Sequence, residues 1–294
     1  MKFVLIEGCS SRKEVSAYMI KAAKKHFDTV LAVPLDKLRL DFYDGDTKLL
    51  YKNTDLLEFD VCLPRFFSGD GIFAEVVLQT LEESNVYIPS TTDSFRITNN
   101  KYFTMQMLAS FDINVPDSAL SISAEPAKKM ASRIGFPLAV KLISGFGGKG
   151  VMVANSERDL LPLADTLNVF KEFVSFQAFM ENDGSDIRCN VLGDDVFAVK
   201  RTAKKGDWRA NVSLGGRADK IALPKEIKET AIKAARILGL DLCGVDFIKS
   251  KDSYWLIEVN MTPGIMPDYF KGQLAEKFID FIYKRTKHYK ITGS

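Results

Sequence analysis

A glycine-rich segment, Gly145-Phe146-Gly147-Gly148-Lys149-Gly150, constrains the fold more than any other part of the chain, because an apolar run comes directly after it. The spacing Gly-x-Gly-x-x-Gly is that of the dinucleotide-binding loop, which must open a helix whose amino terminus holds a pyrophosphate. Here the segment leads instead into Val151-Met152-Val153, a run that predicts a strand. Gly150 is followed by valine rather than by Lys-Ser or Lys-Thr, which excludes a Walker loop as well.

What remains is a glycine-rich hairpin between two strands, with Lys141 on the incoming strand and Lys149 inside the turn. Such a hairpin can cover phosphate groups, because bare backbone N–H groups donate to phosphate oxygens and lysines neutralise their charge. Protein kinases use this arrangement, but the sequence lacks their His-Arg-Asp and Asp-Phe-Gly motifs, so a protein kinase is excluded. A plain surface turn with a solvated lysine explains the segment alone equally well.

The composition narrows the class of protein further. With 294 residues the chain has room for about two or three domains. Its 40 Lys and Arg residues against 38 Asp and Glu residues exclude a general electrostatic binder of nucleic acid, and two histidines hardly suffice for a zinc site or a Ser-His-Asp triad. No apolar run approaches the roughly 20 residues of a membrane span, and the amino terminus lacks a signal-peptide pattern. We therefore expect a cytoplasmic protein with neither nucleic acid nor membrane as a partner.

The four cysteines, Cys9, Cys62, Cys189 and Cys243, are scattered along the chain without a Cys-x-x-Cys spacing. Three of them lie in apolar runs, where a buried and inert thiol is the usual state of a free cysteine. We therefore expect no disulfide framework.

The first 95 residues alternate between strand and helix patterns. Strands are expected at 3–6, 29–33, 60–63 and 86–88, and helices at about 13–27 and 72–84. Such alternation favours a parallel sheet, and hence a small α/β domain that ends at the polar stretch 89–94. Arg12 and Arg65 follow predicted strands, where α/β sheets bind ligands, so they either steer an anionic substrate or are solvated surface arginines.

The rest of the chain predicts an α+β arrangement. Helices are expected at about 99–111, 126–134 and 225–238, and strands at 137–142, 151–153, 176–180, 186–192, 196–202 and in a hairpin over 244–260. The predicted fold class is thus α/β and α+β, with domains at 1–95, 96–180 and 181–294.

The hairpin over 244–260 gathers acidic side chains. Alternation puts Glu258 and Asn260 on one face and the apolar Ile257 on the other. Folding about the polar turn brings Asp246 opposite Glu258, to within a residue or two of register. Facing carboxylates repel each other, and a hard divalent cation such as Mg²⁺, which takes oxygen ligands, relieves that repulsion. The alternative is a solvated strand face with an incidental acid pair.

Several motifs occur in a characteristic order. They are the helix lysine Lys101, the strand lysine Lys141, the glycine hairpin, Gln177-Ala178-Phe179-Met180, Asp186-Ile187-Arg188-Cys189, Gly206-Asp207-Trp208-Arg209-Ala210-Asn211, Gly244-Val245-Asp246 and Glu258-Val259-Asn260-x-x-Pro263-Gly264. Together, from about residue 64 to 264, they resemble the ATP-grasp superfamily and, within it, the RimK-like α-L-glutamate ligases. The resemblance implies a substrate-side pre-ATP-grasp domain followed by central and C-terminal ATP-grasp subdomains.

The resemblance also implies roles for individual residues. Residues expected to bind ATP are Lys101 and Lys141 at the α- and β-phosphates, Gly145, Gly147 and Gly148 in the hairpin, and Gln177, Ala178, Phe179 and Asp186 around adenine. Residues expected to hold one or two Mg²⁺ ions, or Mn²⁺ as the alternative, are Asp246, Glu258 and Asn260. Residues expected to face the reacting carboxylate and its acyl phosphate are Arg188, Arg201, Arg209 and Asn211. Ala178 stands where the family commonly has an acid, so adenine would be bound there through the backbone only.

The implied activity is that of an ATP-dependent carbon–nitrogen ligase. The expected substrates are an amino acid, L-glutamate, and a carboxylate acceptor, either a protein C-terminus or a small coenzyme, and we expect the protein to be a homo-oligomer. Two alternatives stay open: an ATP-grasp ligase with another amine or acid, and a non-catalytic nucleotide-binding regulator, although the intact metal set argues against a pure binder. A basic stretch at 284–290 is better explained as a solvated helix face than as a nucleic-acid contact.

Overall fold

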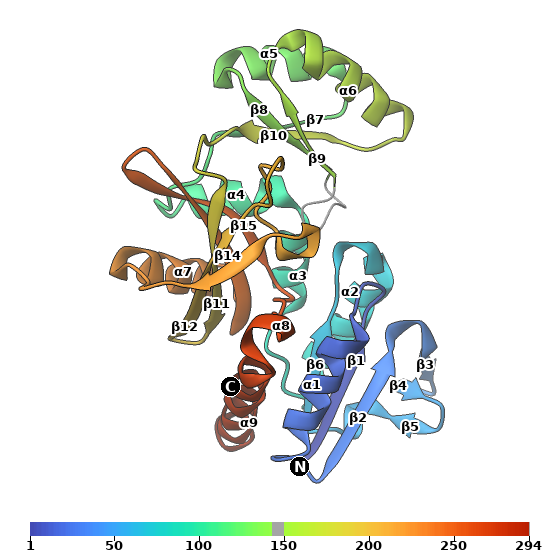
Figure 1. Ribbon diagram of the computed structural model, residues 1–294. Coiled ribbons are helices and arrows are strands. Elements are labelled where there is room, and N and C mark those ends of the chain that lie inside the picture. Colours follow the sequence, from blue (N-terminus) through green and yellow to red (C-terminus); the bar gives the residue numbers. More distant parts are fainter. Residues whose placement is uncertain (143–149, 294) are drawn as a thin grey trace. The chain divides into compact units, whose positions relative to one another are not determined.

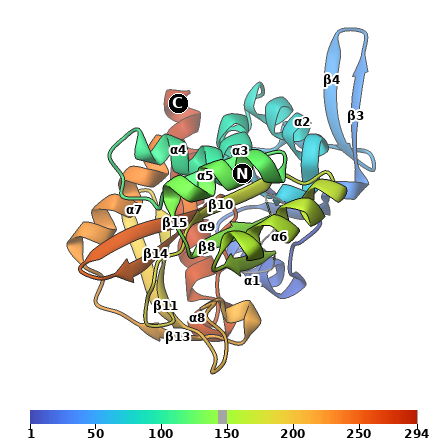
Figure 2. The same ribbon diagram turned by 90° about the horizontal axis from the view of Figure 1, so that it is seen from above.

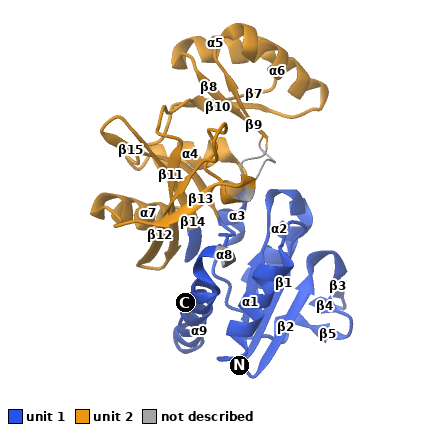
Figure 3. Cartoon of the chain, in the orientation of Figure 1, with its two compact units in different colours: residues 1–96, 239–243, 261–294 blue, residues 97–238, 244–260 orange. Residues whose placement is uncertain are grey.

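The computed structural model (Figure 1) describes residues 1–142 and 150–293, so Gly145, Gly147 and Gly148 of the predicted glycine hairpin lie outside the described residues. The chain divides into two compact units, coloured separately in Figure 3. Unit 1 comprises residues 1–96, 239–243 and 261–294, and unit 2 comprises residues 97–238 and 244–260. The division into three domains stays a prediction.

Unit 1 is built on a three-stranded parallel sheet, which confirms the α/β prediction for the start of the chain. The sheet has the order β2 (Thr29–Pro34), β1 (Lys2–Glu7) and β6 (Val61–Arg65), and its helices are α1 (Lys13–Ala23), α2 (Gly71–Glu82), α8 (Pro267–Phe270) and α9 (Gln273–Thr292). The strand expected at 86–88 is reduced to a single bridge between Val61 and Tyr87. Pro89 follows shortly afterwards, and a proline cannot donate to a strand ladder.

A second, antiparallel sheet in unit 1 was not predicted. It consists of β3 (Leu38–Tyr43), β4 (Asp46–Tyr51) and β5 (Thr54–Asp55), and Figure 2 shows β3 and β4 lying side by side. The tight turn between them is possible because Asp44 and Gly45 both adopt positive φ, at 55° and 84°.

Unit 2 contains two antiparallel sheets with helices. The first has the order β7 (Ser118–Ser121), β10 (Val174–Ala178), β8 (Leu138–Lys141) and β9 (Val151–Ala154), and α5 (Ala124–Ile134) and α6 (Glu157–Val169) cover one face of it (Figure 1). Apolar side chains such as Leu138, Leu160 and Phe176 fill the core between these layers. The predicted strand after the glycine hairpin is therefore confirmed as β9.

The second sheet carries most of the predicted site. Its order is β13 (Arg217–Lys220), β12 (Asp195–Thr202), β11 (Ser185–Leu192), β14 (Leu242–Ser250) and β15 (Ser253–Asn260), with α7 (Lys225–Ile237) packed on β11 and β12. Helix α3 (Thr92–Asn99) spans the boundary between the units, and α4 (Lys101–Ala109) contacts both β7 and β15, so it joins the two sheets of unit 2. Among the described residues no helix is both long and apolar enough to cross a membrane.

Candidate active site

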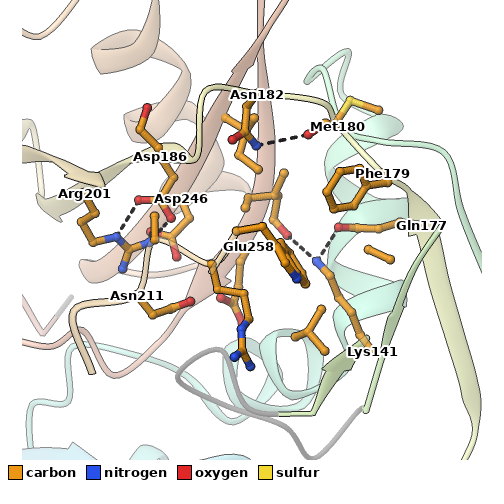
Figure 4. A pocket seen from close by; sticks show the side chains of 18 of the residues that line it. Lys141, Gln177, Phe179, Met180, Asn182, Asp186, Arg201, Asn211, Asp246 and Glu258 are labelled. Carbon is orange, nitrogen blue, oxygen red and sulfur yellow. Dashed lines mark hydrogen bonds and ion pairs between the residues drawn. The ribbon is translucent and has the colours of Figure 1, made fainter. Parts of the chain in front are cut away.

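One cleft in unit 2 brings together most of the residues singled out from the sequence. It encloses about 860 Å³ of empty space, a volume that includes open solvent. The predicted residues that line it are Lys101, Lys141, Gln177, Ala178, Phe179, Asp186, Arg201, Arg209, Asn211, Asp246 and Glu258 (Figure 4). Arg188 and Asn260 do not line the cleft itself, but Arg188 contacts Asp246 and Asn260 lies two residues beyond Glu258 on β15.

Aspartates and arginines form a buried network on one side of the cleft. Asp186 on β11 stands directly opposite Arg201 on β12, and two hydrogen bonds of 2.6 Å join the carboxylate to the guanidinium. Arg201 also lies 3.1 Å from Asp246, and Arg188 Nε lies 2.5 Å from the same carboxylate. Burial would lower the pKa of Arg201, but Asp246 and Asp186 outweigh it and raise the pKa, so this arginine stays charged. Asp186 is thus committed to Arg201.

Two lysines occupy the other side of the charged region. Lys101, the first residue of α4, donates to Glu258 at 2.9 Å. Lys141 on β8 donates to Gln177 and lies 3.5 Å from the carbonyl oxygen of Ile257. Burial lowers the pKa of Lys141 to about 8, against the attraction of Glu258. Burial alone would raise the pKa of Glu258, but Lys101 and Lys141 outweigh it and lower the pKa to about 2, so the carboxylate is ionised at neutral pH.

The acidic hairpin has the predicted register, with one correction. Asp246 pairs directly with Glu258, as expected from the length of the turn. A bulge then follows, because Phe247 pairs with Leu256 and leaves Ile257 without a partner across the ladder. The predicted strict alternation is therefore interrupted at Ile257, and both Ile257 and Glu258 line the cleft.

The described residues allow a test of whether Asp246, Glu258 and Asn260 could hold a metal ion. They contain no group of three or more His, Cys, Asp or Glu residues that could hold a metal ion. Asn260 Nδ2, however, is buried and makes no hydrogen bond, whereas Asp246 Oδ1 is buried and held by its ion pairs with Arg188 and Arg201. The nitrogen and oxygen of an asparagine amide are interchangeable by rotation, so Asn260 can present an oxygen. Two carboxylates and one amide oxygen fit Mg²⁺, which is usually completed by water and by oxygens of a phosphate substrate.

The segment expected to meet adenine has most of its main-chain groups already paired. The N–H groups of Ala178 and Phe179 donate to the carbonyls of Asp117 and Pro137, at 2.8 Å and 3.0 Å. The Met180 carbonyl accepts from Asn182 at 3.1 Å. Within the described residues the N–H of Met180 makes no hydrogen bond, so it is the donor that remains for a ligand at this edge.

The loop after β12 contributes the remaining predicted residues. Asp207 accepts hydrogen bonds from both the main chain and the side chain of Arg209, at 2.9 to 3.0 Å, and these bonds lower the pKa of the Asp207 carboxyl. Asn211 also lines the cleft. Sequence reasoning missed the apolar lining, which consists of Ala139, Val151, Met180, Trp208, Ile248 and Ile257. The one available sequence signal was Trp208, because a tryptophan is unusual inside a polar motif such as Gly206-Asp207-Trp208-Arg209.

In unit 1 the two arginines after the parallel strands have different environments. The Arg12 side chain is exposed, whereas Arg65 is buried and lies 3.4 Å from the carbonyl oxygen of Pro263. Burial lowers the pKa of Arg65 to about 10. Arg65 is therefore not a solvated surface arginine.

Comparison with known proteins agrees with this geometry. Residues 98–282 match the RimK-like ATP-grasp domain family. The chain is 30% identical over 253 residues to a probable alpha-L-glutamate ligase from Vibrio vulnificus, covering 84% of each chain. It is 33% identical over 240 residues to a protein of the same name from Legionella pneumophila, covering 79% of this chain and 78% of that one.

Solved structures share the fold at lower identity. The ATP-grasp ligase PsnB, complexed with a minimal precursor, superimposes with a TM-score of 0.75 at 16% identity, covering 97% of this chain and 99% of that chain. The D-alanine–D-alanine ligase from Bacillus anthracis, complexed with ATP, gives a TM-score of 0.72 at 20% identity and covers 100% of this chain and 99% of that one. The family match, the relatives and the cleft agree: the chain belongs to the RimK-like ATP-grasp family and is an ATP-dependent ligase.

Proposed function

We propose that the protein joins the amino group of an amino acid, L-glutamate, to a carboxylate acceptor through an acyl phosphate, with release of ADP and phosphate. The observation that carries the proposal is the charge arrangement in the cleft. Each carboxylate of the metal set faces a cation, Glu258 with Lys101 and Asp246 with Arg188 and Arg201. Every one of these charges can exchange its present partner for a phosphate oxygen or a metal ion.

In this proposal Lys101 and Lys141 bind the phosphates of ATP. With Lys101 on a phosphate, the carboxylate of Glu258 would be free to hold Mg²⁺ together with Asp246 and Asn260. The bound Mg²⁺ would neutralise negative charge on the phosphate oxygens. Because burial holds the pKa of Lys141 at about 8, a nearby phosphate is needed to keep this lysine fully charged under mildly alkaline conditions.

The reaction needs no nucleophile from the protein. The acceptor carboxylate attacks the γ-phosphorus of ATP, which forms an acyl phosphate and ADP, and the amine then attacks the acyl carbon and displaces phosphate. Arg209 and Asn211 supply hydrogen-bond donors at the cleft, where they would orient the carboxylate and stabilise charge on its phosphate. A planar guanidinium suits both groups, since it can bind a carboxylate or a phosphate through two N–H donors.

The substrate class rests on the relatives. Proteins that share about 30% of the sequence are named probable alpha-L-glutamate ligases, which supports glutamate as the amine. Two of the structural neighbours, an ATP-grasp ligase and a macrocyclase, are bound to a precursor peptide, which supports a carboxylate on a peptide or protein as one class of acceptor. A small coenzyme carboxylate is the other class, and the expected homo-oligomer stays a prediction.

The decisive assay incubates the purified protein with ATP, Mg²⁺, L-glutamate and a panel of peptides and coenzyme acids. We expect ADP release that depends on both glutamate and acceptor, and an acceptor mass increased by one or more glutamyl residues. Arg209→Met should lower this transfer by about 100-fold, because loss of one charged donor at a developing oxyanion typically has an effect of this size. The matched control Arg217→Met changes an exposed arginine on β13 and should leave the rate unchanged.

The outcomes discriminate between the candidate functions. If another amino acid replaces glutamate, the ligase assignment stands and the named substrate is wrong. If no acceptor gains mass and no ADP forms with any amino acid, the proposed transfer fails and the alternative of a non-catalytic nucleotide-binding regulator gains support.

A further inference from the structure

Trp208 and Phe179 form an aromatic pair at the cleft. Their ring centroids lie 5.4 Å apart with an interplanar angle of 71°, an edge-on arrangement that leaves ring faces available for other contacts. Phe179 directly follows β10, and Trp208 belongs to the loop that follows β12, so the pair connects the two sheets of unit 2. Both side chains line the cleft, and Trp208 is 41% exposed.

The loop holds Trp208 in a defined position. Asp207 and Arg209, its two neighbours, are tied together by main-chain and side-chain hydrogen bonds. The loop also closes tightly on itself, because a Cβ atom at Gly216 would lie 2.6 Å from the carbonyl oxygen of Ala210. The indole is thus exposed because the loop that carries it is held in a fixed conformation.

Charged and apolar side chains both line the cleft. Asp186, Arg201 and Asp246 lie on one side of it in Figure 4, and Phe179 and Met180 lie on the other side, together with Lys141 and Gln177. Further apolar side chains of the lining are Ala139, Val151, Ile248 and Ile257. The lysines of the lining suit phosphates, and the aromatic rings, with the unpaired N–H of Met180, suit a flat heterocycle with hydrogen-bonding edges.

Trp208 also has an unused polar group. Its indole N–H makes no hydrogen bond with any of the residues that the structure describes. A tryptophan at a binding site usually finds a partner for this donor when it is covered. A nucleotide that enters the cleft would supply both an aromatic face for the ring and acceptor atoms for the N–H.

From these observations we propose that Trp208, supported by Phe179, forms one wall of the nucleobase subsite and contributes to the selection of the base. The inference rests on the proposed function, because it takes the cleft to be the ATP site. It adds a residue that binds the base and not the phosphates. Trp208 should therefore distinguish a nucleotide from a ligand that has phosphates alone.

The test compares ATP with inorganic tripolyphosphate, which carries the phosphates without a base. Trp208→Ala should weaken ATP binding about tenfold, equivalent to roughly 1.4 kcal/mol, and leave tripolyphosphate binding unchanged. Trp208→Phe should restore most of the ATP affinity, because a smaller aromatic ring can still contact a base. The control Trp255→Phe, which alters the other tryptophan of the chain, should bind both ligands like the original protein.

Fluorescence gives a second measurement on the same variants. In Trp255→Phe the only tryptophan is Trp208, and ATP should change its emission strongly, whereas tripolyphosphate should not. In Trp208→Phe, where only Trp255 emits, ATP should have little effect. An emission change of Trp208 that is the same for both ligands would contradict a direct contact with the base.

The results separate this inference from the proposed function. Lys141→Met should weaken the binding of ATP and of tripolyphosphate alike. If it does so while Trp208→Ala weakens neither ligand, or weakens both equally, the cleft is the phosphate site and the role of Trp208 is refuted. If the original protein binds neither ligand, both the proposed function and this inference fail.

Discussion

Arg201 should matter more for the stability of unit 2 than its partner Asp186, although the two side chains share one ion pair. The Arg201 side chain is 7% exposed, and the side chains of Asp186 and Asp246 are 9% and 2% exposed. Replacing Arg201 by methionine leaves Asp186 as a buried carboxylate without a cation, whereas Asp246 keeps Arg188. Breaking a buried ion pair in this way costs about 3–5 kcal/mol of unfolding free energy.

Asp186→Asn should lower the free energy of unfolding by less than Arg201→Met does. Arg201 keeps Asp246 at 3.1 Å, and the amide oxygen of the new asparagine can still accept one hydrogen bond from the guanidinium. The free energy of unfolding should therefore fall by only about 1–2 kcal/mol, because a hydrogen bond to a carboxylate is replaced by a weaker one to an amide oxygen. The difference between the two variants follows from the three-membered network and not from the pair alone.

Urea unfolding measures this difference directly. Both tryptophans of the chain, Trp208 and Trp255, lie in unit 2, so their fluorescence reports on that unit. The unfolding midpoint, measured with EDTA and without nucleotide, should fall further for Arg201→Met than for Asp186→Asn. The control Arg217→Met breaks an exposed pair with Asp219 and should change stability by less than about 1 kcal/mol. An equal or larger loss for Asp186→Asn would refute the network reasoning.

Two further predictions concern unit 1 and the cysteines. Gly8→Ala should destabilise the protein by about 2 kcal/mol, because the added Cβ would lie 2.8 Å from the carbonyl oxygen of Arg65. The loss should appear as a lower melting temperature. The control Gly264→Ala, which has open space around the added Cβ, should melt at the temperature of the original protein. Brief treatment of the folded protein with iodoacetamide should modify Cys9 alone, since the other three cysteines are buried, and mass spectrometry showing two or more adducts would contradict the described packing.

The elements that sequence reasoning predicted are those set by local patterns. The parallel sheet of unit 1 follows from strand and helix alternation, and the pairing of Asp246 with Glu258 follows from the length of one turn. The hairpin of β3 and β4 could also have been predicted, because Asp44-Gly45 is a strong turn signal between two alternating runs. The pattern is nevertheless weak, because charged residues interrupt both strands and some of their large apolar side chains, such as Phe42 and Tyr43, are exposed.

The features that could not be predicted depend on contacts between distant segments. The bulge that brings Ile257 to the cleft has no residue signature of its own, since it arises from the backbone fit of β15 to β14. The sharing of Arg201 between Asp186 and Asp246 requires the strand order β12, β11, β14, which no local pattern contains. The sequence showed which charged residues are present, but not which of them neutralise each other.

The central claim is that Asp246, Glu258 and Asn260 hold Mg²⁺ beside the phosphates of ATP in the cleft of unit 2. Calorimetric titration of ATP with and without Mg²⁺ tests it most directly. We predict that Mg²⁺ tightens ATP binding to the original protein and to the control Glu229→Gln, an exposed position on α7, but that Glu258→Gln loses most of this gain. If Mg²⁺ strengthens ATP binding to Glu258→Gln as much as to the original protein, the metal assignment is contradicted.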